Sequence, residues 1–309
     1  MRKCVVIYNP NSGKKIKKDF LAAFIDILLQ NEYVPEVIFS KYSGHITEIV
    51  KGLENPDLVI SIGGDGTFNE SMSGNILREN RLLLAHIPVG TTNDIGAMFG
   101  YGKDIINNLK MLMDGEEREI DICTINGRPF VYVAGFGKFL NVPYETSREL
   151  KKHLGHMAYL MEGVKEFNQS TPLYDITYEV DGEKYNGLYS FCIISNATRI
   201  AGINGFFKDV KLDDNKFEVL LCNITNKKDI VKSLYYLATT DITKVPGFYF
   251  HKVSSMEIKF HDKIERNWCI DGEKLEELSD SYKINVPRNV RLLLPKKNIE
   301  ELFSNEKAQ

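Results

Sequence analysis

The segment VISIGGDGTFNESM, residues 59–72, joins an apolar run to two glycines, an aspartate and a third glycine. An uninterrupted apolar run of this length is typical of a buried strand in a parallel sheet. Thr67 and Glu70 have the spacing of a capping box, which predicts a helix that starts at Thr67. The segment therefore predicts a strand that turns sharply into a helix, with a carboxylate in the turn.

The residues of this turn suit a phosphate-binding site. Gly63, Gly64 and Gly66 allow a tight turn and a close approach of a ligand to the backbone. A helix start offers free N–H groups to phosphate. Asp65 would repel that phosphate unless a cation lies between them, and Mg²⁺, bound directly or through water, is suited to that role. The alternative is a tight turn in which the aspartate only caps.

Strand-like and helix-like segments alternate over the first 125 residues. Strands are expected at 3–9, 35–40, 57–62 and 81–88, and helices at 18–31, at 45–53, from 67, near 92–100 and at 104–113. This alternation predicts a parallel sheet with helices on both faces. Ligands of such sheets bind outside the carboxyl ends of the strands.

Two further polar turns follow apolar strands at this same predicted edge. NPNSGKK, residues 9–15, offers amides, a hydroxyl and lysine charge to a phosphate. PVGTTNDIG, residues 88–96, offers a glycine, two hydroxyls, an amide and a second acid, Asp94. Each turn alone is an ordinary loop or helix start. Together with the Asp65 turn they predict a nucleotide-phosphate site.

The pattern changes after Asp121. Asn126-Gly127 and Asp181-Gly182 lie between β-rich runs and predict hairpins. Further strand candidates are FYFHKVSSMEIKFHD, NWCIDGEKLE, YKINV and VRLLLP, and helices are expected at about 157–167 and 228–238. We therefore expect a mostly antiparallel β-sandwich at residues 126–287, after an α/β domain of residues 1–125 that is completed by residues 288–309.

Composition narrows the class of protein. The chain has 309 residues, of which 43% are apolar and 26% charged, as in a globular protein of about two domains. A net charge of −3 and a pI near 6.1 argue against a dedicated nucleic-acid-binding protein. No apolar segment approaches the roughly 20 residues that span a bilayer, and no signal peptide is visible. Five cysteines without a CxxC pair suggest reduced thiols and a cytoplasmic location.

The motifs NPNSG (9–13), GGDGTFNE (63–70) and PVGTTND (88–94) resemble, in this order, the diacylglycerol kinase catalytic-domain family. That family includes soluble bacterial lipid kinases and sphingosine kinases. The resemblance covers nearly the whole chain, through EIDI (119–122), PYETSRELKKHLG (143–155), KLDDNKF (211–217) and DGE (271–273). GGDGT alone is less specific, because NAD kinases and phosphofructokinases share it.

The resemblance implies a nucleotide domain and a lipid-substrate domain with the active site between them. It implies that Asp65, Asp94 and Asp121 form a water-linked magnesium network and that Glu273, with Asp271 beside it, is the general base. Ser40 stands where relatives carry threonine, which keeps the hydroxyl. The implied ATP contacts are Asn9, Pro10, Asn11, Ser12, Gly13, Ser40, Gly63, Gly64, Asp65, Gly66, Thr67, Asn69, Glu70, Gly90, Thr91 and Asn93.

KLDDNKF resembles a structural magnesium site of the family. Asp214 would supply its carboxylate, and Lys211 and Lys216 their backbone carbonyls, since oxygen ligands suit Mg²⁺. Asn215 stands where relatives usually have glycine, and asparagine tolerates positive φ. From the residues alone, a surface turn here and a plain hairpin at CIDGEKLE (269–276) are the alternatives.

The function implied is a magnesium-dependent transfer of the ATP γ-phosphate to a lipid hydroxyl, with diacylglycerol as the first candidate and phosphatidic acid as its product. A sphingoid base, another lipid alcohol or a phospholipid head group are alternative acceptors. NAD kinase and a non-catalytic nucleotide-binding regulator are the further alternatives. Basic clusters at 14–18 and 148–153 would contact an anionic membrane transiently or be solvated helix faces. The nearest relatives imply a homodimer.

Overall fold

The computed structural model describes residues 1–13, 18–137, 173–200, 203–204, 207, 209–223, 246–262, 268–275 and 279–304. The chain divides into two compact units, Met1–Asp121 with Arg288–Gln309 (unit 1) and Ile122–Pro287 (unit 2). The helices expected near 157–167 and 228–238, the basic cluster at 148–153 and Lys14, Lys15 and Lys17 lie outside the described residues.

Unit 1 is built on a parallel sheet. Its strands are β1 (Arg2–Tyr8), β2 (Tyr33–Phe39), β3 (Leu58–Gly63), β4 (Leu84–Pro88) and part of β18 (Ser281–Leu294), in the order β2-β1-β3-β4-β18. β3 and β4 are buried along their whole length, as central parallel strands should be. The chain leaves β1 toward β2 and returns to β3 on the other side. The carboxyl ends of β1 and β3 therefore flank a topological switch point, where such sheets bind ligands.

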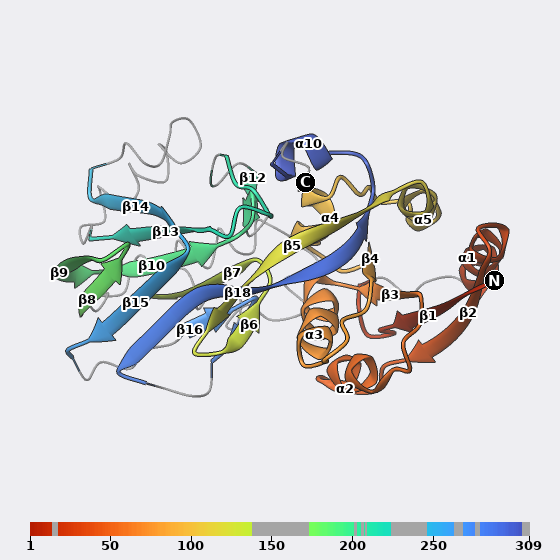
Figure 1. Ribbon diagram of the computed structural model, residues 1–309, viewed down its shortest axis with the longest axis horizontal. Helices are drawn as coiled ribbons and strands as arrows, with labels where there is room; N and C mark the ends of the chain where they lie inside the picture. Colours follow the sequence, from red (N-terminus) through yellow and green to blue (C-terminus); the bar gives the residue numbers. More distant parts are fainter. Residues whose placement is uncertain are drawn as a thin grey trace. The chain divides into compact units, whose positions relative to one another are not determined.

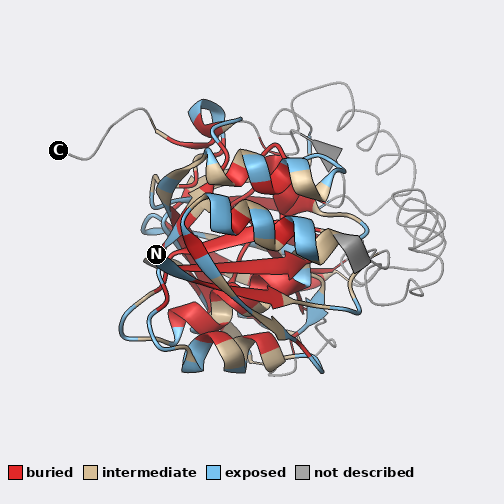
Figure 2. Cartoon of the chain, turned by 90° about the vertical axis from the view of Figure 1, so that its right-hand side faces the viewer, coloured by how far each residue is buried: buried red, intermediate tan, exposed pale blue. Residues whose placement is uncertain are grey.

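Helices cover both faces of this sheet, as expected. They are α1 (Lys18–Gln30), α2 (His45–Gly52), α3 (Asp65–Ile76), α4 (Asp94–Met98) and α5 (Ile105–Met113), followed at the end of the chain by α10 (Ile299–Leu302). α1 packs with α5 on one face and α2 with α3 on the other (Figure 1). Figure 2 shows the strands buried between the helices, whose outward sides are exposed. None of the described helices has the length and apolar character needed to cross a membrane.

The predicted start of α3 was wrong. The helix begins at Asp65 with Gly64 as its N-cap, so Thr67 and Glu70 do not form a capping box. The Glu70 carboxylate instead accepts the backbone N–H of Ile46 at 3.1 Å, in the first turn of α2. Because the N-cap of α2 is Gly44, which has no side chain, Glu70 supplies the acceptor that this helix start lacks.

Unit 2 is an antiparallel β structure made of two sheets, which confirms the expected second fold. One sheet contains part of β18 with β15, β8 and β9; β5 also pairs with β18, and β6 pairs with β5. The other sheet has the order β14-β13-β10-β7-β16-β17. Both sheets contribute to one apolar core, with Phe136, Phe217 and Trp268 from the second and Tyr178 and Tyr282 from the first. The strands are β5 (Glu116–Ile125), β6 (Arg128–Phe130), β7 (Val133–Gly137), β8 (Tyr174–Val180), β9 (Glu183–Tyr189), β10 (Phe191–Ser195), β13 (Phe217–Cys222), β14 (Phe248–Val253), β15 (Ser255–Phe260), β16 (Trp268–Ile270) and β17 (Glu273–Lys274), with β11 (Arg199–Ile200) and β12 (Ile203–Asn204) as a separate pair.

Three hairpins of unit 2 have the same two-residue turn. Asn126-Gly127 joins β5 to β6, Asp181-Gly182 joins β8 to β9, and Asp271-Gly272 joins β16 to β17. Both residues of each turn have positive φ, with values of 47° and 82°, 50° and 82°, and 49° and 88°. This is the type I′ geometry that Asn-Gly and Asp-Gly favour, so the predicted hairpins are confirmed.

The segments YKINV and VRLLLP are not separate strands. They form the single strand β18, which pairs antiparallel with β15 as far as Asn285 and parallel with β4 at Leu292. Pro287, which has no N–H to donate, lies between these two paired stretches. This proline marks the change of partner within β18.

Asn75 provides a test of how α3 is joined to β4. Its side chain is fully buried, donates to the Leu82 carbonyl at 3.0 Å and accepts the Leu82 N–H at 2.8 Å. Asn75→Ala would leave both backbone groups buried and unpaired, and we expect the free energy of unfolding to fall by about 2–4 kcal/mol in urea denaturation. Asn80→Ala, an exposed position before the same strand, is the control and should change it by less than about 0.5 kcal/mol. Equal losses in the two variants would contradict this role of Asn75.

Candidate functional site

The loops after β1 and β3 are bonded to each other in unit 1. The Asn9 amide donates to the Thr67 hydroxyl at 3.0 Å, and the Ser12 hydroxyl lies 3.4 Å from the same Thr67 oxygen. The Asn9 N–H donates to the Ile62 carbonyl at 3.0 Å. Two of the three predicted polar turns are therefore adjacent at the carboxyl edge of the sheet.

The third turn approaches them through its backbone. The Val89 N–H donates to the Gly63 carbonyl at 2.7 Å. A Cβ on Gly13, whose φ is +64°, would lie 1.6 Å from the Val89 carbonyl oxygen, and one on Gly90 would lie 2.6 Å from the Gly64 Cα. No other residue fits at Gly13 or Gly90 without moving a neighbouring loop. The three turns thus form one continuous surface of backbone and small polar side chains.

Asp65 caps a helix, but not its own. Its Oδ2 accepts the Asp94 N–H and its Oδ1 the Ile95 N–H, each at 3.1 Å, where α4 begins. Asp65 therefore has a capping role, which was the alternative to a role in metal binding. Its two hydrogen bonds join the Asp65 turn to the PVGTTND turn. Asp65 is only half-buried.

The other two acids are more enclosed. Asp94 is 2% exposed, and Asp121, within β5, is also 2% exposed. Among the described residues, no three or more His, Cys, Asp or Glu side chains are grouped to hold a metal ion. The water-linked magnesium network of Asp65, Asp94 and Asp121 that the resemblance implies stays a prediction.

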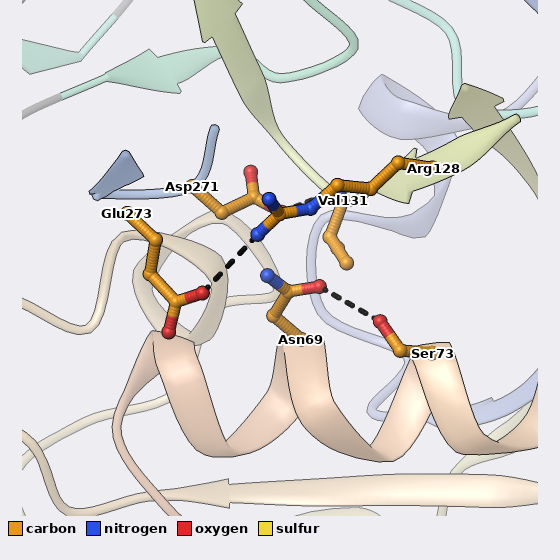
Figure 3. Close-up of polar contacts among 6 residues, drawn as sticks. All are labelled: Asn69, Ser73, Arg128, Val131, Asp271 and Glu273. Carbon is orange, nitrogen blue, oxygen red and sulfur yellow. Dashed lines mark hydrogen bonds and ion pairs between the residues drawn. The ribbon is translucent and has the colours of Figure 1, made fainter. Parts of the chain in front are cut away.

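The remaining predicted ATP contacts differ in their burial and in their hydrogen-bond partners. Ser40 is buried directly after β2, and its N–H donates to the Tyr8 carbonyl at 2.9 Å, which puts it at the same edge as Asn9. Asn69 is buried on α3 and accepts a hydrogen bond from Ser73 at 3.4 Å (Figure 3). Glu70 differs from these, because its carboxylate is engaged at the start of α2. Pro10, Asn11, Gly66 and Thr91 are exposed, and the amide of Asn93 donates to the Gly90 carbonyl at 2.9 Å.

In unit 2, the carboxylate of Asp271 joins two turns of the chain through hydrogen bonds. It is 6% exposed and accepts the backbone N–H groups of Val131, Tyr132 and Val133 at 2.7, 3.0 and 3.0 Å. These bonds hold the turn between β16 and β17 against the bend between β6 and β7. Burial raises the pKa of Asp271 to about 6, although the three N–H donors act in the opposite direction.

Glu273 is the accessible carboxylate of the DGE motif. It is exposed in β17, opposite Ile270, and its Oε2 lies 3.3 Å from the guanidinium of Arg128 (Figure 3). The oxygens of Asp271 are engaged by three N–H donors, so Glu273 is better suited to take a proton from an incoming hydroxyl. Arg128 was missed from sequence because a basic residue after a hairpin turn is ordinary, and only the fold brings it to Glu273.

The predicted structural metal ligands lie in the turn before β13. The Lys216 N–H donates to Asp214 Oδ1 at 3.1 Å. Asn215, which stands where relatives usually have glycine, has a φ of 56°, a conformation that asparagine tolerates. Asp214 Oδ2 lies 2.8 Å from the ammonium of Lys252, on β14. Lys252 was also missed from sequence, because only the pairing of β13 with β14 brings it to this turn.

The pKa of Asp271 implies a pH-dependent stability. Because the folded pKa is raised from 3.8 to about 6, the contribution of this group is fully present below pH 4 and is lost as the pH rises through 6. Asp271→Asn removes the titration. Between pH 4 and pH 7 we expect the unfolding free energy of the wild type, measured relative to this variant in urea, to fall by about 2 kcal/mol. A difference that stays constant with pH would contradict the shift.

Comparison with known proteins identifies the family. The family model described as diacylglycerol kinase catalytic domain matches residues 3–125. The chain is 30% identical over 304 residues to the diacylglycerol kinase of Staphylococcus epidermidis, covering 97% of this chain and 95% of that protein. It is 28% identical over 305 residues to the diacylglycerol kinase of Bacillus subtilis, covering 98% of this chain and 99% of that protein.

Solved structures share the fold. A crystal structure of a diacylglycerol kinase from Bacillus anthracis superposes with a TM-score of 0.74 at 20% identity. A second structure from the same organism superposes with a TM-score of 0.80 at 22% identity, and each match covers 95% of this chain and 97% of the other. The relatives, which match over nearly the full length of the chain, carry the family assignment: this chain belongs to the diacylglycerol kinase family and is a lipid kinase.

Proposed function

We propose that this lipid kinase transfers the γ-phosphate of ATP to a lipid hydroxyl, with diacylglycerol as the first candidate acceptor and phosphatidic acid as its product. The observation that carries the proposal is the convergence of three polar turns at the switch point of the parallel sheet. The names of the full-length relatives support the choice of acceptor. A sphingoid base, another lipid alcohol or a phospholipid head group would present the same chemistry.

Unit 1 would bind the nucleotide. The start of α3, beside the loop at Asn9–Gly13, would offer N–H groups, and the positive end of the helix dipole favours phosphate there. Thr67 and Ser12 add hydroxyls. Gly13 and Gly90 leave no side chain between the loops, so a phosphate can reach the backbone.

Magnesium would be held through water by Asp65, Asp94 and Asp121. When bound, the ion would supply charge neutralisation for the phosphates, which is most of what phosphoryl transfer needs from its surroundings. Asp65 is suited to this task because the N–H groups of α4 fix both of its oxygens in place.

Unit 2 would supply the base. Glu273 would accept the proton of the lipid hydroxyl while the oxygen–phosphorus bond forms and the bond to the ADP oxygen breaks. Asp271 would act as a positioning residue, because its three N–H bonds fix the turn that carries Glu273. Arg128 would hold the Glu273 carboxylate in one orientation.

Glu273→Gln tests the base. We expect kcat for transfer from γ-labelled ATP to diacylglycerol in mixed micelles to fall by about 10²–10⁴-fold. The melting temperature should be nearly unchanged, because the side chain is exposed. Glu257→Gln, which changes an exposed carboxylate on β15, is the matched control and should retain full activity. Near-wild-type turnover in Glu273→Gln would assign the base to another group.

Gly13→Ala tests the nucleotide loops. The added methyl group would force the loop away from the Val89 carbonyl, and we expect kcat/KM for ATP to fall by about 100-fold. Weaker binding of ATP, measured by calorimetry without lipid, should accompany this loss. Gly52→Ala, where the methyl group meets nothing within 4 Å, is the control. Unchanged ATP affinity in Gly13→Ala would show that the nucleotide does not bind at these loops.

The donor and the acceptor are tested in one further assay. ATP and GTP are each presented with diacylglycerol, a sphingoid base, other lipid alcohols and a phospholipid, with NAD as a non-lipid acceptor. Label in phosphatidic acid from ATP alone would support the proposal. Label confined to another lipid would replace diacylglycerol as the acceptor, and equal transfer from GTP would contradict dependence on ATP.

A further inference from the structure

The turn before β13 surrounds an ammonium group. The Nζ of Lys252 lies 2.8 Å from Asp214 Oδ2 and 3.5 Å from Glu218 Oε1, and it donates a hydrogen bond to the Asp209 carbonyl at 2.9 Å. All four residues belong to unit 2. We call this arrangement the Lys252 cluster. One cation thus contacts two carboxylates and a backbone carbonyl.

The burial of the cluster favours a cation beside its carboxylates. The Glu218 side chain is fully buried, while the side chains of Asp214 and Lys252 are 21% and 29% exposed. In the described part of the chain, neither oxygen of Glu218 has a hydrogen-bond partner. A buried carboxylate that stays ionised without a cation is strongly destabilising, and the Lys252 ammonium is the cation that the structure places beside Glu218.

The fold fixes the position of this ammonium. Lys252 stands directly opposite Glu218 in the antiparallel pair of β13 and β14. The bond from the Lys216 N–H to Asp214 Oδ1 holds the carboxylate of the turn, which leaves Oδ2 for the ammonium. Strand register and a local turn, rather than a flexible surface contact, therefore bring the three charges together.

We propose that the Lys252 ammonium is the resident cation of this turn, in place of the divalent ion that resemblance to the family implies there. The ammonium takes carboxylate and carbonyl oxygens, the ligand types that Mg²⁺ prefers. A divalent ion on Asp214 Oδ2 would lie within a few ångströms of the ammonium and be repelled by it. The fold of unit 2 then requires no divalent cation at residues 211–216.

The first test compares the response to Mg²⁺ of the wild type and Asp214→Asn. The melting temperature of each full-length protein is measured without nucleotide, in EDTA and in millimolar Mg²⁺. We expect the shift caused by Mg²⁺ to be the same in both, because Mg²⁺ does not bind at Asp214. A shift larger by about 2 °C or more in the wild type would place a divalent ion at this turn and overturn the proposal.

The second test removes the ammonium. Lys252→Met should lower the melting temperature by about 5 °C or more, because it leaves a buried carboxylate without its cation. Lys184→Met is the matched control, since Lys184 also faces a glutamate across two strands of unit 2, at 3.4 Å. That pair is 69% and 42% exposed, so its loss should cost less than about 2 °C.

Lys252→Arg keeps the positive charge and changes the shape of the side chain, so it distinguishes the effect of charge from that of size. This variant should retain most of the stability that Lys252→Met loses. Equal losses in Lys252→Met and Lys184→Met, or an equal loss in the arginine variant, would overturn the proposal. Should Lys252→Met fail to fold, the comparison of the wild type with Asp214→Asn decides the question, because neither protein lacks the ammonium.

Discussion

The close approach of three backbone turns at the carboxyl edge of the parallel sheet is the constraint on which the candidate nucleotide site of unit 1 depends. Glycines at 13, 64 and 90 let the loops meet with no side chain between them. The bond from the Val89 N–H to the Gly63 carbonyl extends the pairing of β3 and β4 into this region. The sheet thereby presents backbone and small polar side chains at its switch point.

The carboxylates of the motifs divide by what their oxygens contact. Asp65, Glu70 and Asp271 each accept backbone N–H groups and so stabilise the start of a helix or the bend between two strands. Glu273 is exposed and faces a guanidinium. The acids that join backbone segments are thus distinct from the exposed acid, Glu273. The sequence motifs alone do not show this division, because glutamate occurs in both groups.

Unit 2 is stabilised in two different ways. Its centre is an aromatic core in which Phe136 and Trp268 pack with Tyr282. Near the edge of one sheet, by contrast, charge is buried and is balanced by a lysine across the strand pair. Replacing a bound ion by a side chain makes the cation part of the chain, so its presence no longer depends on the concentration of the metal.

Much of this protein was determined by local sequence. The alternation of apolar runs with helical segments predicted the α/β fold, and Asn-Gly and Asp-Gly predicted the hairpins, because strand burial and positive φ depend on a few neighbouring residues. Motifs at strand ends predicted the polar turns that meet at the carboxyl edge of the sheet. Tertiary structure alone decided that Asp65 caps α4, that Glu70 caps α2 and that Lys252 lies at Asp214. These contacts join residues far apart in the chain, and their partners are set by strand register and helix packing, which short-range sequence patterns do not encode.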